Sequence, residues 1–159
     1  MTKGLELDLP CGVRFEIENL VLDMNGTLSL DGEFLPGVAE RLRRLSDILN
    51  VFILTADTNQ TATKIQEDLG VVIRVLGPGR GDVQKLHFIE ELGREKTAAI
   101  GNGYNDVLML REAALGICII GHEGACKEAL MASDAVFRDI NDALDLFLNP
   151  NRLVATFRR

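Results

Sequence analysis

Hydrophobic and polar positions along this chain alternate between two patterns. Short apolar runs typical of buried strands are separated by segments in which apolar residues recur at helical spacing. After an initial hairpin, strands are predicted at residues 20–23, 51–54, 71–76, 97–100, 115–120 and 135–137. Helices are predicted at residues 36–49, 57 or 58 to 69, 82–93, about 106–114, 125–132 and 139–148. Such alternation predicts an α/β fold, with a doubly wound parallel sheet between two layers of helices.

Two hairpins and a tail complete the predicted organisation. Alternating residues on both sides of Pro10-Cys11-Gly12 predict a hairpin at about 4–18, and Asp31-Gly32 predicts a smaller one at 28–35. We expect a single domain, with a core at about 19–148 and a short tail at about 149–159.

Helix boundaries are predicted from capping residues. Asp57 or Thr58 is expected to cap the helix that Gly70 stops, and Asp82 is expected to cap the helix that carries Lys85.

The run Leu20-Val21-Leu22 is followed at once by Asp23, with Gly26 three residues later. In open α/β sheets, ligands bind beyond the carboxyl ends of the strands, so Asp23 is placed where chemistry usually occurs. Gly26 allows the backbone to turn tightly around a group held by the carboxylate. The alternative is that Asp23 simply caps the loop that follows.

Composition narrows the class of protein. The chain has 159 residues, of which 47% are hydrophobic, and a net charge of −7, which argues against nucleic acid as a main partner. No apolar run approaches the roughly 20 residues of a membrane span, and the N-terminus lacks an apolar signal core. The three cysteines form no CxxC pair, which favours thiols and a cytoplasmic location.

Further polar residues follow other predicted strands. Thr55 ends the second core strand, Lys85 lies in the helix after the third, and Gly101-Asn102-Gly103-Tyr104-Asn105-Asp106 follows the fourth. With Asp23-Met24-Asn25-Gly26-Thr27, these segments resemble in order the four motifs of the haloacid dehalogenase superfamily. The resemblance is strongest to its small proteins related to the phosphorylation domain of P-type ATPases.

This resemblance implies a Rossmann-like core and a Mg²⁺-dependent phosphohydrolase. Asp23 would be the nucleophile that forms an aspartyl phosphate, and Lys85 would supply positive charge. Thr55 and backbone N–H groups near Asn25 would donate hydrogen bonds to the phosphoryl group. The other expected contacts to a phosphorylated substrate, whether small or macromolecular, are Gly26, Thr27, Ala56, Arg80 and Asn105. The implied Mg²⁺ ligands are Asp23, the carbonyl of Asn25, Asn102 and, in support, Asp106.

Two residues depart from the superfamily pattern. Asn25 stands where phosphatases carry the Asp that acts as general acid and base, and losing such catalysis costs about 10²–10⁴-fold. Asn102 stands at the usual metal carboxylate, which removes one negative charge. The alternative function is therefore an impaired relative that binds a phosphorylated ligand or a protein partner. A third possibility is a subunit whose acid/base comes from another chain.

The spacing of the motifs leaves no room for a cap domain, which implies an open site. We expect self-association, with the tail residues Leu153, Val154 and Phe157 or the 28–35 hairpin at a neighbour's site.

Three remaining features have simpler interpretations. The loop Gly77-Pro78-Gly79-Arg80-Gly81 lacks the Gly-Lys-Ser/Thr ending of a nucleotide-binding loop, so we expect it to place Arg80 near the substrate. His87 is interpreted as a packing residue, and His122 as a residue that could border the site.

Overall fold

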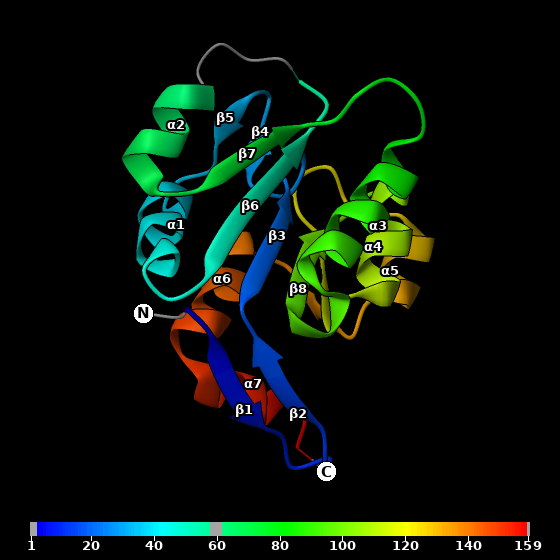
Figure 1. The fold of residues 1–159 in the computed structure, drawn as a ribbon. Coiled ribbons are helices and arrows are strands. Elements are labelled where there is room, and N and C mark those ends of the chain that lie inside the picture. Colours follow the sequence, from blue (N-terminus) through cyan, green and yellow to red (C-terminus); the bar gives the residue numbers. More distant parts are fainter. Residues whose placement is uncertain (1–2, 58–61, 159) are drawn as a thin grey trace.

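The computed structural model describes residues 3–57 and 62–158. Its centre is a six-stranded sheet in the order β10-β9-β8-β3-β6-β7, in which every neighbouring pair is parallel. The strands are β3 (Asn19–Asp23), β6 (Asn50–Thr55), β7 (Val72–Val75), β8 (Thr97–Gly101), β9 (Leu115–Ile119) and β10 (Ala135–Phe137). The predicted doubly wound parallel sheet is confirmed, with β3 in its interior (Figure 1).

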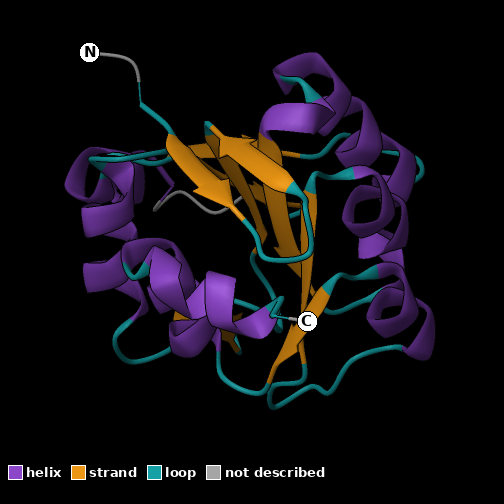
Figure 2. Ribbon diagram, turned by 90° about the horizontal axis from the view of Figure 1, so that it is seen from below, coloured by secondary structure: helices purple, strands orange, loops and turns teal. Residues whose placement is uncertain are grey.

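Helices cover both faces of the sheet (Figure 2). One layer contains α1 (Val38–Ser46), α2 (Ala62–Leu69) and α6 (Ile140–Leu148), and the other contains α3 (Gly81–Leu92), α4 (Val107–Glu112) and α5 (Lys127–Ala132). Short 3₁₀ turns, η1 (Arg94–Lys96) and η2 (Tyr104–Asp106), precede β8 and α4. On β3, Leu20 and Leu22 join one apolar core whereas Val21 joins the other, as strand alternation requires. All five residues of β3 are buried, so Asp23 is held on a rigid support.

Both predicted hairpins are present, β1 (Leu5–Asp8) with β2 (Arg14–Ile17) and β4 (Ser29–Leu30) with β5 (Glu33–Phe34). In the smaller one, Asp31 has φ 53° and Gly32 has φ 85°. Positive φ at both central residues is the conformation that the Asp-Gly pair favours in a tight hairpin.

Some predicted helix boundaries are wrong. The first helix starts at Val38 instead of residue 36, because Gly37 precedes it in a left-handed conformation (φ 86°), and it ends at Ser46, which leaves Leu49 buried in the following turn. Asp82 lies in the first turn of α3, and Arg80 occupies the N-cap position. Thr58, the alternative cap of the second helix, lies outside the described residues.

The tail forms a helix that was not predicted, α7 (Pro150–Thr156). Leu153 is buried, and the ring of Phe157 meets that of Phe15 in the hairpin edge-on, with 6.4 Å between the centroids. The hairpin and α7 lie at the end of the sheet opposite the carboxyl end of β3 (Figure 1). The tail is therefore not the exposed apolar cluster that we expected to reach a neighbour's site.

Among the described residues, no helix is both long and apolar enough to cross a membrane.

Candidate active site

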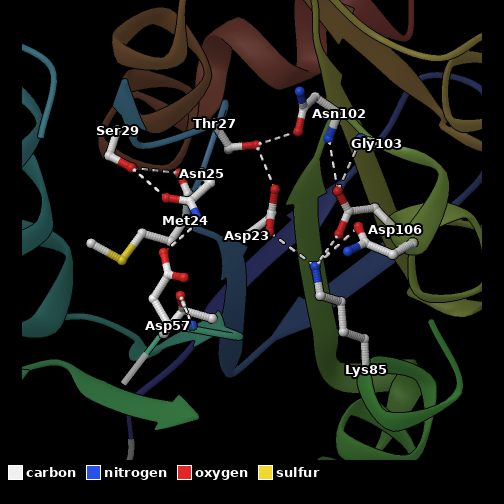
Figure 3. Close-up of polar contacts among 12 residues, drawn as sticks. Asp23, Met24, Asn25, Thr27, Ser29, Asp57, Lys85, Asn102, Gly103 and Asp106 are labelled. Carbon is white, nitrogen blue, oxygen red and sulfur yellow. Dashed lines mark hydrogen bonds and ion pairs between the residues drawn. The ribbon is translucent and has the colours of Figure 1, made fainter. Parts of the chain in front are cut away.

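Asp23 lies at the carboxyl end of β3, where its carboxylate meets the ammonium of Lys85 (Figure 3). Lys85 comes from α3 and is only 1% exposed, and its Nζ lies 2.9 Å from Asp23 Oδ1 and 2.7 Å from Asp106 Oδ1. Asn105 Oδ1 accepts a third, longer hydrogen bond from the same nitrogen, at 3.4 Å. Lys85 is therefore held between two carboxylates and an amide.

Burial and charge oppose each other in this cluster. Burial, together with the charge of Asp106, raises the pKa of Asp23 to about 6, although Lys85 and Thr27 act in the other direction. Burial alone would lower the pKa of Lys85, but Asp106 and Asp23 raise it above its ordinary value. Lys85 consequently stays positively charged at neutral pH. The neighbouring carboxyl group of Asp23 loses its proton only slightly below neutral pH.

Asp106 is fully buried and both of its oxygens are engaged. Oδ1 bonds Lys85, and Oδ2 accepts hydrogen bonds from the backbone N–H groups of Asn102, at 3.0 Å, and Gly103, at 3.1 Å. The carboxylate packs so closely on Gly101 that a Cβ there would collide with it. Asp106 thus fixes both the 102–103 turn and Lys85, which fits a supporting role better than direct metal ligation.

Thr27 connects Asp23 to Asn102. Its buried hydroxyl lies 3.3 Å from Asp23 Oδ2 and 3.2 Å from Asn102 Oδ1 and can donate to either. Asn102 is fixed in turn, because its Nδ2 donates to the carbonyl of Gly124 at 3.2 Å and its own carbonyl accepts from the N–H of Cys126 at 3.0 Å. Two side-chain oxygens, from Asp23 and Asn102, therefore converge on one hydroxyl.

On the opposite side of Asp23, the exposed Asn25 side chain turns away from Lys85 (Figure 3). Its Nδ2 donates to Asp57 Oδ2 at 2.9 Å, and its Oδ1 accepts a long bond from Ser29 Oγ at 3.4 Å. Thr55 ends β6 and is buried, and its Oγ1 accepts from the N–H of Asp57 at 3.1 Å. Asp57, interpreted from sequence as a helix cap, is therefore part of this side of the site.

A family model of haloacid dehalogenase-like hydrolases matches residues 14–114. The chain is a haloacid dehalogenase-like hydrolase. This confirms the predicted family.

Individual relatives of this hydrolase agree with that assignment. An uncharacterised protein of Methanocaldococcus jannaschii is 55% identical over 84 residues, which cover 50% of this chain and 90% of that protein. A soluble P-type ATPase-like phosphatase of the same organism is 26% identical over 160 residues, which cover 91% of this chain but only 59% of that protein.

Solved structures show the same fold. The 3-deoxy-D-manno-octulosonate 8-phosphate phosphatase of Moraxella catarrhalis, solved with magnesium, phosphate and KDO, has a TM-score of 0.69 at 21% identity, and the match covers 89% of this chain and 94% of that one. The cobalt-bound enzyme of Haemophilus influenzae has a TM-score of 0.70 at 17% identity, covering 90% and 94%.

The hydrolase has a cavity of about 210 Å³ at this edge of the sheet. The predicted site residues that line it are Asp23, Asn25, Thr55, Ala56, Lys85, Asn102 and Asn105. A second and larger cavity, of about 360 Å³, is lined by residues that include Gly26, Thr27 and His122. Asp23 is not among the residues that line this larger cavity, so we place the chemistry in the smaller one.

Several predicted contacts lie elsewhere. The exposed Arg80 pairs with Asp82 at 2.7 Å and is not among the residues that line the smaller cavity. The N–H groups of Gly26 and Thr27 donate to the carbonyls of Ser29, at 2.9 Å, and Met24, at 3.2 Å. These two N–H groups of the Asp23 loop are therefore already engaged within the loop, and for the other N–H groups near Asn25 the contact with a phosphoryl group stays a prediction.

A charged residue of the cavity wall, Glu123, was missed. It belongs to the Gly121-His122-Glu123-Gly124 segment, which follows β9 at the same edge of the sheet. The rule that strand ends gather at one edge was sufficient to find it.

Proposed function

We propose that this hydrolase removes phosphate from phosphomonoesters through a phosphorylated Asp23, with Mg²⁺ as cofactor. The observation that carries the proposal is the buried Asp23–Lys85–Asp106 cluster, which opens to the cavity through Asp23. A carboxylate nucleophile splits the transfer into two easier steps. The similarity to a soluble P-type ATPase-like phosphatase supports the same reaction class.

In the first step, an Asp23 oxygen bonds to phosphorus while the bond from phosphorus to the ester oxygen breaks. The ester oxygen leaves with the bonding electrons and takes a proton from solvent, which releases the alcohol. In the second, water attacks phosphorus and loses a proton to solvent, the bond to Asp23 breaks to regenerate its carboxylate, and inorganic phosphate leaves. Lys85 fixes Asp23 Oδ1 at 2.9 Å and offers positive charge to the phosphoryl oxygens in both steps. Thr55 and Asn105 line the same cavity and can donate hydrogen bonds to the remaining oxygens.

The oxygen atoms present suit Mg²⁺. Asp23 Oδ2 and Asn102 Oδ1 converge through Thr27, and the carbonyl of Asn25 is the third predicted ligand. No group of three or more His, Cys, Asp or Glu side chains spaced for a metal ion occurs within residues 3–57 and 62–158. This is compatible with Mg²⁺, which usually keeps several waters and takes one or two carboxylates plus substrate phosphate. When bound, the ion would neutralise charge on the transferring phosphoryl group.

Asn25 determines how fast we expect the phosphoenzyme to be hydrolysed. An amide cannot protonate the leaving alcohol or take a proton from the attacking water, so phosphoenzyme breakdown should be slow. The same observation favours a second candidate function, in which the chain binds a phosphorylated ligand or partner with little turnover. Both functions use the same cavity and differ in the rate at which phospho-Asp23 is lost.

Trapping an analogue of phospho-Asp23 tests the proposal. With Mg²⁺, beryllium fluoride should bind at Asp23, and fluorine NMR should show bound resonances that are lost in Asp23→Ala. A control variant, Asp142→Ala, changes an exposed carboxylate on α6 and should trap like the wild type. Equal trapping in Asp23→Ala would remove Asp23 from the mechanism. Trapping without measurable release of phosphate from aryl phosphates would favour the binding function.

A further inference from the structure

Glu123 reaches the cavity from a loop that no motif includes. The loop connects β9 to α5, and Glu123 lines the cavity together with Asp23, Lys85 and Asn102. Its carboxylate lies against the backbone of Gly26, where a Cβ would collide with Glu123 Oε2 and would stand 2.8 Å from Asn102 Nδ2. Gly26, with φ 78°, therefore leaves room for two side chains beside Asp23.

The loop is fixed by the same residue that Glu123 approaches. Asn102 donates to the carbonyl of Gly124 at 3.2 Å and accepts from the N–H of Cys126 at 3.0 Å, and the loop closes through the N–H of Gly124 and the carbonyl of Gly121 at 2.9 Å. Glu123 thus directly precedes Gly124, whose carbonyl is bonded to the side chain of Asn102. Its place beside Asn102 follows from backbone contacts, although the side chain itself is exposed.

The charge of the site requires a cation. Asp23 and Asp106 share the single ammonium of Lys85, which leaves this cluster with one negative charge when all three are ionised. Glu123 adds a second negative charge to the cavity wall, whereas the amide of Asn102 adds none. A phosphate dianion entering this cavity would meet like charges unless a divalent cation came with it.

We propose that Glu123 is the second carboxylate of the Mg²⁺ site and supplies, from the β9–α5 loop, the charge that Asn102 does not provide. The inference rests on the proposed function, because it concerns the same Mg²⁺. Asp23 and Glu123 then neutralise the ion, Asn102 contributes a neutral oxygen, and Lys85 remains available to the phosphoryl group. Two carboxylates are the number that Mg²⁺ sites commonly use.

The test is Mg²⁺ binding to the full chain without substrate, measured by calorimetry at about neutral pH. Glu123→Gln keeps the shape of the side chain and removes its charge, so the Mg²⁺ dissociation constant should rise about tenfold to a hundredfold. Glu128→Gln, an exposed residue in the first turn of α5, is the matched control and should bind like the wild type. Asn102→Asp should restore tight binding to the Glu123→Gln variant, because it returns one carboxylate to the same cavity.

A second measurement, the melting temperature, distinguishes a wrong assignment of Glu123 from a wrong proposed function. Mg²⁺ should raise the melting temperature of the wild type, and this rise should shrink in Glu123→Gln while the melting temperature without Mg²⁺ stays the same. If the wild type binds Mg²⁺ through Asp23 but Glu123→Gln binds equally well, the assignment of Glu123 is wrong and the proposed function stands. If the wild type shows neither Mg²⁺ binding nor beryllium fluoride trapping, the proposed function itself fails.

Discussion

On one side of Asp23, Lys85 is 1% exposed and bonds two carboxylates at 2.9 and 2.7 Å. On the other side, Asn25 is exposed and is held by one hydrogen bond to Asp57 and a long one from Ser29. The buried side contains the Asp23–Lys85–Asp106 cluster, whereas the exposed side contains Asn25, one of the two residues that differ from the superfamily pattern. Substitutions at Asn25 are therefore easier to accommodate than substitutions at Lys85.

The largest effect is expected from Lys85→Met. The change leaves the carboxylates of Asp23 and Asp106 buried without their shared ammonium, and breaking such a buried pair costs about 3–5 kcal/mol. Urea unfolding followed by circular dichroism should show this loss, and aryl phosphate hydrolysis should disappear. Lys127→Met, an exposed change at the start of α5, is the control. A loss of stability no larger than that of the control would mean that the cluster does not support the fold.

The next largest effect is expected at Asn25, and it tests whether the exposed side limits the rate of phosphate ester hydrolysis. Asn25→Asp supplies an acid/base group, but the new carboxylate would face Asp57, whose Oδ2 lies 2.9 Å from Asn25 Nδ2. Two carboxylates so close would share a proton or move apart, so the single change should give only part of the gain. We expect the pair Asn25→Asp with Asp57→Asn to raise aryl phosphate turnover about tenfold to a thousandfold.

Rapid-quench measurement of phosphoenzyme identifies the step that changes. Asp57→Asn alone is the control and should leave the phosphoenzyme long-lived. If the wild type hydrolyses faster than both Asp variants and accumulates no phosphoenzyme, the acid/base group lies elsewhere and Asn25 is wrongly assigned.

The sequence located those site residues whose place depends on the topology of the sheet. Asp23, Thr55 and the 102–106 turn were found because the carboxyl ends of parallel strands meet at one edge. Lys85 lies inside the helix that follows the third strand, so the strand-end rule named it as a candidate, and the family resemblance then gave it a role. The engaged N–H groups of Gly26 and Thr27 depend on how the loop closes on Ser29 and Met24, which hydrophobic periodicity does not encode.

The tail was missed for a different reason. Leu153 lies in α7 and Phe157 is the C-cap residue four positions later, but the helix spans only Pro150–Thr156, so its pattern is too short to define a period. α7 is held by packing: Leu153 joins the buried core, and Phe157 meets the Phe15 ring of the hairpin, far away in the chain. Short helices of this kind depend on tertiary packing, which the sequence of the segment alone does not show.

A third prediction uses the raised pKa of Asp23, about 6 compared with the ordinary 3.8. A carboxyl group whose pKa is higher in the folded state contributes stability below about pH 3.8 and loses that contribution as the pH rises through about 6. Above that range the ionised group destabilises the metal-free protein by an amount on the order of 2–3 kcal/mol. Asp23→Asn should therefore be more stable than the wild type at about pH 8, and the difference should vanish towards pH 4.

Paired urea titrations of both proteins with a metal chelator measure this difference at each pH. Added Mg²⁺ should stabilise the wild type but not Asp23→Asn, which reduces or reverses the difference. A difference that does not change with pH would show that the stability of Asp23→Asn has a cause other than ionisation.

The smallest effects come from two buried hydroxyls, one on each side of the site. Thr27→Val removes the donor that Asp23 Oδ2 and Asn102 Oδ1 share, and both oxygens are largely buried, so we expect a loss of about 1–3 kcal/mol. Ser29→Ala should cost less than about 1 kcal/mol. Asn25 Oδ1 belongs to an exposed side chain that can turn to water, and the carbonyl of Met24 keeps the N–H groups of Thr27, Leu28 and Ser29 as donors. Urea unfolding of the two variants at one pH compares the sides directly. Equal losses would contradict the distinction between a closely bonded and a loosely bonded side.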